Sequence, residues 1–245
     1  MVEAQQFSGR AFSGLHTPFN GFHTQSGSRH ISDLACTRCA FDNCSIPSAY
    51  KLEERVTVER VRIENCAAAA CFISGAIFND VTVKRFETRS RVGFFCWGSF
   101  FRHVVLSGKV GFLKFNAECH ADYDRMPKQQ AIWNEAYRSF YTTVDWALDI
   151  SGAEFTVGTD LHFVPGRLVR RNPATQVLVT RERLMASNWR SVDWGKSSMP
   201  VAIDWFLQRS LYEDCVFAAP TKSRLFDREM AAIDLLRKSG LAERD

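Results

Sequence analysis

Alternating apolar and polar residues predict β-strands between residues 56 and 116. Val56-Thr57-Val58-Glu59-Arg60 recurs as Val81-Thr82-Val83-Lys84-Arg85, an offset of 25 residues. Phe78-Asn79-Asp80-Val81 recurs as Phe101-Arg102-His103-Val104, an offset of 23 residues. A period of two residues is typical of a half-buried strand. We therefore predict a repeating unit of 23 to 25 residues with one strand at a fixed position in each unit.

A second apolar cluster accompanies each of these strands. Residues 69–73 form one such cluster and residues 94–97 the next, and Cys71-Phe72 recurs there as Cys96-Trp97, again at an offset of 25 residues. A single unit cannot bury its apolar face alone, so units of this kind must stack. Stacked strands lie about 4.8 Å apart. The pattern favours the coils of a right-handed β-helix.

Two further segments place a small residue two positions before a large apolar one, twice, five residues apart. They are Cys39-Ala40-Phe41-Asp42-Asn43-Cys44-Ser45-Ile46 and Leu148-Asp149-Ile150-Ser151-Gly152-Ala153-Glu154-Phe155. These segments resemble the pentapeptide-repeat family, whose quadrilateral β-helices point a small residue and a Leu or Phe inward on each face. The unit between residues 56 and 116 is longer than that family's coil. We therefore expect a mainly β fold, an irregular right-handed β-helix (a solenoid), with a mixed α+β fold as the alternative.

Helical periodicity appears in two places. In the segment that starts at Pro127, apolar residues recur at i, i+3, i+4 and i+7, which predicts an amphipathic helix inserted at about 127–140. Near the C-terminus, the patterns predict a helix over 200–211, a strand over 214–218 and a helix of about 18 residues after Pro220. Thr221 is the predicted N-cap of that last helix, and Gly240 is predicted to follow its end.

These patterns divide the chain into three parts. Residues 1–30 are predicted to be a partly ordered N-terminal lead-in. Residues 31–198 are predicted to form the β-helix with its helical insertion. Residues 199–245 are predicted to form a helix–strand–helix cap with α/β character, which would close the end of the stack and protect its edge from aggregation.

Composition narrows the class of protein without assigning a function. The 245 residues are 46% apolar and 24% charged, with a net charge of +4, which indicates a globular protein. Phe occurs 20 times against 5 Tyr and 6 Trp, as expected where one aromatic position is stacked repeatedly. No secretory signal is visible in residues 1–27, and no apolar run is long enough to span a membrane. We expect a cytoplasmic protein with reduced thiols and no membrane association.

Candidate catalytic groups are few. Cys119 and His120 lie in a polar loop beside the predicted inserted helix, and loops often carry function. A cysteine nucleophile needs a base within hydrogen-bond reach, and adjacent residues seldom face each other, so the base would be His103 or His162. The alternative is a polar loop with no catalytic role. Phosphate-loop and dinucleotide-binding glycine motifs are absent from the sequence, and no cofactor is expected.

Cys36, Cys39 and Cys44 are the candidate metal ligands. Their spacing is similar to part of a zinc site, but tetrahedral zinc needs four sulfur or nitrogen ligands and a second C-x-x-C is missing. Cysteine also packs as a small apolar residue, and Cys39 and Cys44 occupy the predicted inward positions. Three interpretations, core packing, metal binding and a redox role, remain open at this stage.

A basic, aromatic segment between residues 160 and 196 is the candidate binding surface. Its candidate binding residues are Arg167, Arg170, Arg171, Arg190, Trp189 and Trp194. Such a surface suits a protein partner, or a nucleic acid gripped through phosphates and stacked bases. The alternative is a solvated face whose arginine stems pack on the core. No motif for reading base sequence is present.

The sequence favours a non-enzymatic interaction protein that binds and modulates a protein partner, with immunity proteins, inhibitors and effectors as analogies. A cysteine-dependent enzyme that uses Cys119 and a nucleic-acid-binding protein that uses residues 167–196 are the alternatives. A protein partner is expected, and a nucleic acid remains open.

Overall fold

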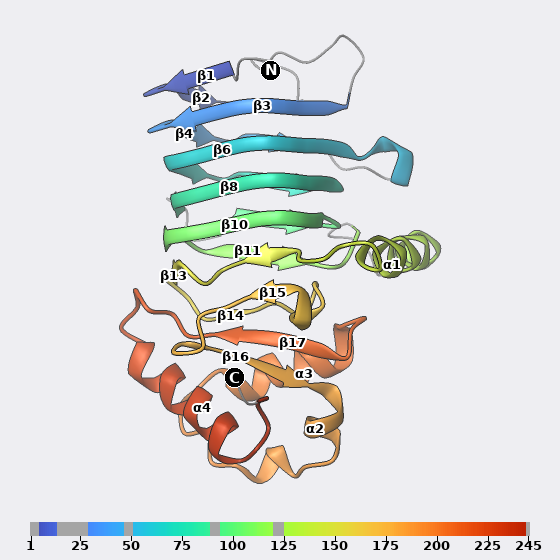
Figure 1. The fold of residues 1–245 in the computed structure, drawn as a ribbon, viewed down its shortest axis with the longest axis vertical. Helices are drawn as coiled ribbons and strands as arrows, with labels where there is room; N and C mark the ends of the chain where they lie inside the picture. The colour runs from blue at the N-terminus through green and yellow to red at the C-terminus, as the bar shows by residue number, and fades with distance from the viewer. Residues whose placement is uncertain (1–4, 14–28, 47–50, 89–93, 120–124, 244–245) are drawn as a thin grey trace.

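The computed structural model describes residues 5–13, 29–46, 51–88, 94–119 and 125–243. One large parallel sheet of ten strands, sheet A, runs from the N-terminal end of the molecule toward the C-terminal helices (Figure 1). Its main path is β1 (Gln5–Ser8), β3 (His30–Thr37), β6 (Val56–Ala69), β8 (Ala76–Thr88), β10 (Phe100–Val110), β12 (Leu148–Asp149) and β15 (Val169–Arg170). Off this path lie β2 (Ala11–Ser13), β4 (Ala40–Asp42) and β13 (Ala153–Phe155).

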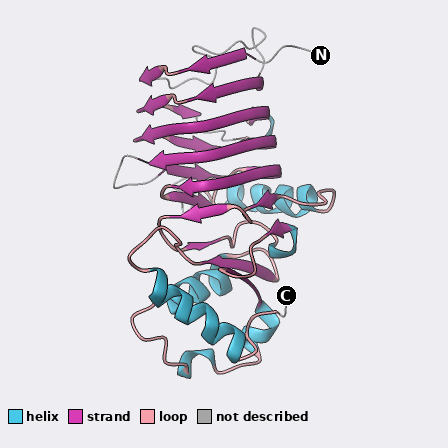
Figure 2. Cartoon of the chain, turned by 60° about the vertical axis from the view of Figure 1, so that its left-hand side comes forward, coloured by secondary structure: helices cyan, strands magenta, loops and turns pink. Residues whose placement is uncertain are grey.

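Two smaller sheets, four α-helices and short 3-10 helices at Leu52–Glu54, Gly166–Leu168 and Trp189–Ser191 accompany sheet A in the described structure. Sheet B is parallel, with the order β11 (Leu113–Asn116), β9 (Phe94–Trp97), β7 (Phe72–Ser74) and β5 (Ser45–Ile46). Sheet C is antiparallel, with the order β14 (Thr159–Asp160), β17 (Asp214–Ala218) and β16 (Gln176–Thr180). The helices are α1 (Pro127–Tyr141), α2 (Arg181–Met185), α3 (Met199–Arg209) and α4 (Phe226–Lys238). Figure 2 shows that all but α1 gather at the C-terminal end.

The expectation of a mainly β, irregular right-handed β-helix is wrong. The structure has mixed α/β content, with 26% helix and 42% strand, built around the large parallel sheet. A mixture of helices and strands was expected only under the alternative, a mixed α+β fold. The sequence repeat misled because it matched Val58 to Val83, whereas the partner of Val83 in the sheet is Ile63, five positions further along β6. Cys71 and Cys96 likewise are not partners, since Cys96 pairs with Ile73.

The second repeat, between β8 and β10, is confirmed in the sheet. Val81 pairs with Val104, and Phe78 pairs with Phe101, as their matching sequences predicted. The rings of Phe78 and Phe101 stack with centroids 5.4 Å apart and planes inclined by 6°. The neighbouring strands β3 and β6 are related by a longer step along the chain, which pairs Leu34 with Val61. Unequal steps mean that no single repeat length describes the sheet.

The three longest strands bend at residues with left-handed backbone. They are 14, 13 and 11 residues long, and their left-handed residues are five apart: Arg60 and Asn65 in β6, Asp80 and Arg85 in β8, and His103 and Gly108 in β10. Left-handed backbone costs a residue with a Cβ about 1–2 kcal/mol. The packing that follows each bend offsets this cost, because the next residue points into the core and is buried, as Val61, Cys66 and Val81 are.

Most of the local helix predictions are confirmed. α1 begins at Pro127 and buries Trp133, Tyr137 and Tyr141. α3 and β17 match the predicted helix over 200–211 and the predicted strand over 214–218. The predicted N-cap at Thr221 is wrong, since α4 begins at Phe226 after turns and is 13 residues long. Gly240 follows the end of α4 with φ +69°, as predicted.

Part of the predicted lead-in is ordered as strand. β1 and β2 pair in parallel with β3 and β4, and Phe7 is buried. Residues 14–28 lie outside the described residues. Two hydrophobic cores form, one between sheets A and B and continuing to α1, the other among sheet C, α3 and α4.

Candidate binding groove on sheet A

The bends of neighbouring strands align in a row of charged side chains on the surface of sheet A. The strand register places Asp33, Arg60, Asp80 and His103 side by side. Arg60 donates from Nε to Asp33 Oδ1 at 2.7 Å and from Nη2 to Asp33 Oδ2 at 2.8 Å. Opposite charges on adjacent strands attract, so the alternation of acid and base along the row stabilises the pairing of the strands.

His103 lies between two carboxylates. Its Nδ1 is 3.0 Å from Asp80 Oδ1, and its Nε2 is 2.7 Å from Asp145 Oδ1. The hydrogen bond with Asp145, followed by that with Asp80, raises the pKa of His103 against the opposing effect of desolvation. A ring that donates from both nitrogens carries a positive charge. The arrangement therefore favours imidazolium at this position.

An aromatic ring extends the row toward the C-terminal end of sheet A. The Trp146 ring lies 4.7 Å from the His103 ring, and the guanidinium of Arg170 lies 4.1 Å from the Trp146 ring centroid. A guanidinium at that distance is attracted by the ring face. Trp146 therefore has two cationic groups as neighbours, one from β10 and one from β15.

We name the hollow over these side chains the sheet A groove. It is lined by Gln6, Asp33, Leu34, Ala35, Arg60, Arg62, Asp80, Thr82, His103 and Trp146. Arg62 belongs to a second row, which runs through Thr82, Val105 and Asp149 to Arg170. Arg62 and Arg170 are both exposed, and neither forms an ion pair with a residue that the structure describes. They are four strand spacings apart, about 19 Å.

Two carboxylates at this row, those of Asp33 and Asp145, have lowered pKa values. The hydrogen bond from Arg60 lowers the pKa of Asp33 to about 2, and the hydrogen bond with His103 lowers the pKa of Asp145. Asp33, Asp80 and Asp145 each have a cationic partner in the row. Two exposed cations beside these paired groups, Arg62 and Arg170, are left to attract an acidic ligand.

Of the residues singled out from the sequence, His103 lines this groove, and Arg170 lies next to it over the Trp146 ring. Asp33, Arg60, Asp80, Asp145 and Trp146 were missed. The sequence carried a partial signal, because the predicted inward residues Cys39 and Cys44 are five residues apart, and in the structure the residues directly before them, Arg38 and Asn43, have left-handed backbone. The residue five positions before Arg38 is Asp33, which also has left-handed backbone.

The candidate nucleophile is inside the protein. Cys119 is 2% exposed, its backbone N–H donates to Gln130 Oε1 at 2.8 Å, and its carbonyl accepts from Ser74 Oγ. His120 lies outside the described residues. His162 is buried, and His103 is engaged by Asp80 and Asp145. Cys119 is therefore a core residue, and His103 belongs to the charged row of sheet A.

The candidate metal ligands are hydrogen-bonded thiols in the core region. Cys39 Sγ donates to the carbonyls of Phe7 and Thr37 at 3.6 Å, and Cys44 Sγ donates to those of Phe12 and Asp42. Burial raises the pKa of Cys36 to about 12. Zinc binds the thiolate form, which burial disfavours at Cys36. Among the described residues, no group of three or more His, Cys, Asp and Glu is placed to hold a metal ion.

The basic segment is largely occupied by internal contacts. Trp189 and Trp194 are 4% and 8% exposed and belong to the second core. Arg190 pairs with Asp204 at 2.6 Å and lies over the Trp189 ring, while Arg167 pairs with Asp214 at 3.5 Å. Arg171 is half-buried. Stacking of these two indole rings on a ligand would require the second core to open.

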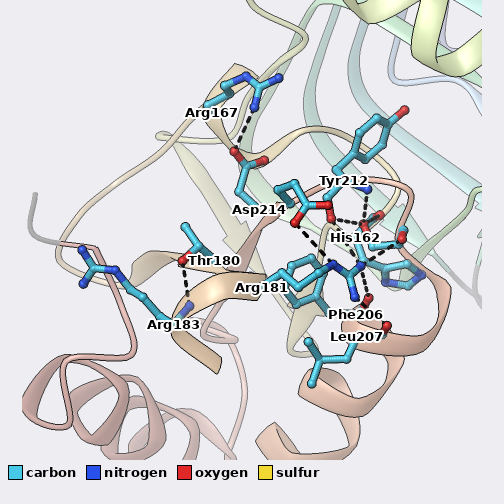
Figure 3. A network of polar contacts seen from close by, with 11 residues as sticks. His162, Arg167, Thr180, Arg181, Arg183, Phe206, Leu207, Tyr212 and Asp214 are labelled. Atoms are coloured by element: carbon cyan, nitrogen blue, oxygen red, sulfur yellow. Dashed lines mark hydrogen bonds and ion pairs between the residues drawn. The ribbon is translucent and has the colours of Figure 1, made fainter. Parts of the chain in front are cut away.

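Arg181, in the same segment, holds the C-terminus of α3. Its guanidinium donates to the carbonyls of Leu207 at 2.7 Å and Ser210 at 3.0 Å, and it also contacts the carbonyls of Phe206 and Tyr212 (Figure 3). The last carbonyls of a helix lack intrahelical donors and carry partial negative charge. Arg181 therefore has a structural role in joining α2 to α3.

Comparison of the chain with protein-family models, with curated proteins and with solved structures gives no match. Among the helices that the structure describes, none combines the length and the apolarity needed to cross a membrane.

Proposed function

We propose that the protein is a non-enzymatic binding protein that takes an acidic segment of a protein partner into the sheet A groove. The observation that carries this proposal is the pair of exposed arginines, Arg62 and Arg170, beside a row of the sheet whose carboxylates are already paired. Carboxylates of a partner would pair with the positive charges of Arg62 and Arg170. Arginine beside an aromatic ring is typical of the residues that dominate binding energy at interfaces.

The rigidity of the surface supports a binding role. The groove side chains stand on parallel strands whose register is set by a packed core on the other side of the sheet. Side chains fixed in this way lose little conformational freedom when a partner binds. Charge complementarity would also steer the partner toward the groove.

Two observations favour binding over cysteine-dependent catalysis. Cys119 is buried, and both ring nitrogens of His103 are engaged by carboxylates, which leaves no lone pair for accepting a proton in this arrangement. A general base must accept that proton.

The groove also favours a protein over a nucleic acid. A phosphate backbone laid along the row would pass close to the carboxylates of Asp33, Asp80 and Asp145, and Glu59 lies beside Arg60 at 2.6 Å. Such carboxylates repel a continuous polyanion, whereas a protein segment can place its acidic groups selectively.

Peptide binding tests the proposal. Wild-type protein is titrated into fluorescent peptides rich in Glu and, separately, into a single-stranded oligonucleotide. The double variant Arg62→Glu/Arg170→Glu should weaken peptide binding by about tenfold or more, because two favourable contacts become repulsive. Arg125→Glu/Lys128→Glu reverses two exposed charges near the start of α1 and serves as the matched control.

We also expect the control variant to bind the peptides as the wild type does. The circular dichroism spectra of both variants should match that of the wild type. Equal weakening in the two double variants, or no peptide binding by the wild type, would overturn the proposal. Tighter binding of the oligonucleotide than of any peptide would instead favour nucleic acid.

A further inference from the structure

Arg62 and Arg170 lie at the two ends of one row of outward side chains that crosses sheet A. Between them the strand register places Thr82, Val105 and Asp149. Four strand spacings separate the two arginines, about 19 Å. The positive charges of this row are therefore at its ends, and a ligand that pairs with both arginines must carry two negative groups about that far apart.

The hollow beside this row suits an extended chain better than a helix. It lies between two rows whose members are two residues apart along each strand, as Arg60 and Arg62 are on β6 and Asp80 and Thr82 are on β8. Two residues of a strand span about 7 Å. An α-helix with its side chains is about 10–12 Å across, whereas extended chains lie side by side at about 4.8 Å.

An extended segment in this hollow would run across the strands. The backbones of β6, β8 and β10 already pair with a strand on each side, so the segment cannot join the sheet as a further strand, and its side chains must make the contacts. Successive side chains of an extended chain point to opposite faces. Six residues span about 20 Å and return to the same face, whereas a separation of five or seven turns one side chain away from the sheet.

The carboxylates near the middle of the row restrict what the segment carries between its two ends. Asp149 lies in the row itself, and Asp80 and Asp145 lie in the neighbouring row, where both contact His103. A further acidic side chain that faced the sheet here would approach these carboxylates and be repelled. The charge pattern therefore favours a segment that is acidic at its two ends and uncharged between them.

We infer that the acidic segment bound in the sheet A groove is extended, crosses the strands, and carries two acidic side chains six residues apart with no acidic side chain facing the sheet between them. This inference rests on the proposed binding function and specifies the partner. One acidic side chain pairs with Arg62 and the other with Arg170, whose guanidinium lies 4.1 Å from the Trp146 ring centroid. A cation held in this way loses little freedom on binding.

Peptides of equal composition test the inference. Each carries two Glu residues in a chain of Thr and Gln, at positions i and i+6 in the first peptide, i and i+5 in the second, and i and i+7 in the third. The wild-type full chain should bind the first peptide about threefold or more tightly than the other two, measured by fluorescence anisotropy at low salt. A fourth peptide adds Glu at i+2 and i+4 to the first. It should bind more weakly than the first in spite of its greater charge.

Three single variants show whether the two arginines set the spacing. Arg62→Gln and Arg170→Gln should each reduce the affinity for the first peptide to that for the second and third, because only one charged contact remains. Arg125→Gln, at an exposed arginine near the start of α1, should keep the preference of the wild type. Circular dichroism checks that all three variants are folded.

The outcomes separate this inference from the proposed function. Equal affinities for the first three peptides, a preference that survives in Arg62→Gln, or tighter binding of the fourth peptide than of the first would overturn the inference. Each of these results would leave the proposed function standing, since it requires only that acidic peptides bind through the two arginines. Absence of binding by all four peptides would overturn both.

Discussion

Asp145 Oδ1 lies 2.7 Å from His103 Nε2, while Asp80 holds the other ring nitrogen at 3.0 Å. The three residues come from positions 80, 103 and 145 of the chain and meet because β8, β10 and β12 are neighbours in sheet A. The contact fixes the ring orientation of His103 beside Trp146, and it makes the groove sensitive to pH.

The pKa of His103 is expected to lie above its usual value of about 6.5. Because Asp145 has the larger effect, Asp145→Asn should lower this pKa more than Asp80→Asn does. NMR titration of the ring protons measures both changes. A pKa at or below the usual value in the wild type would contradict the geometry.

The same pairing should make the free energy of unfolding depend on pH. When the pKa of a histidine is higher in the folded than in the unfolded state, its full contribution to stability is present at a pH below the unfolded-state pKa. That contribution is lost as the pH rises through the folded-state pKa. Stability should therefore fall from weakly acidic toward alkaline pH, and His103→Gln should flatten that part of the profile. Chemical denaturation at several pH values measures the effect.

Asp33 should remain ionised at a lower pH than an ordinary aspartate because Arg60 donates two hydrogen bonds to it. The pKa of Asp33 is about 2, and Arg60→Gln should return it toward the usual value for aspartate. When the pKa of an aspartate is lower in the folded than in the unfolded state, its contribution to stability is present above the unfolded-state pKa and is lost as the pH falls through the folded-state pKa. The free energy of unfolding of the variant should therefore depend less on pH in the acid range. Carboxyl-carbon NMR measures the change, and Arg38→Gln, elsewhere on the sheet, is the control.

Gly111 should not tolerate a side chain. A Cβ there would lie 2.5 Å from Thr88 N and 2.5 Å from Thr88 Oγ1, and that hydroxyl accepts from Phe112 N at 2.8 Å. Gly111→Ala is expected to destabilise by about 1–3 kcal/mol. Gly158→Ala, whose added Cβ meets nothing within 4 Å, is the control. Urea unfolding compares the two, and equal stabilities would show that the strand shifts without cost.

Arg181→Met should destabilise the C-terminal part of the protein. The variant keeps an apolar stem but leaves the carbonyls of Leu207 and Ser210 without their charged donor, a loss of about 2–4 kcal/mol. Arg190→Met, at an arginine whose side chain is 65% exposed, should change stability by less than about 1 kcal/mol. Thermal unfolding followed by tryptophan fluorescence distinguishes them, since Trp189 and Trp194 lie in the affected core.

The thiols should react slowly with iodoacetamide in the folded protein. Burial raises the pKa of Cys36 and of Cys96 to about 12, and only the thiolate reacts. Cys44 is half-buried and the other seven cysteines are buried, so Cys44 should be modified first. Peptide mass spectrometry after timed alkylation gives the order. Fast modification of Cys119 would instead revive the cysteine-enzyme alternative.

Local sequence determined the elements that depend on near neighbours. The apolar stripe after Pro127 predicted α1, and the alternation around Val81 and Val104 predicted two strands in their true register. These succeed because helical and strand periodicity are set within a few residues of the chain. The start of α4 was placed too early because turn residues continue the apparent stripe.

Tertiary structure alone decided the candidate site and the class of fold. Asp33 meets Arg60, and Asp80 meets His103, only because the sheet register brings them together, and the steps from β3 to β6, from β6 to β8 and from β8 to β10 follow no single period. The same holds for Trp189, which the sequence placed on a binding surface and which packing buries. Cross-strand neighbours are chosen by how the whole core fills, and that choice leaves no local pattern in the sequence.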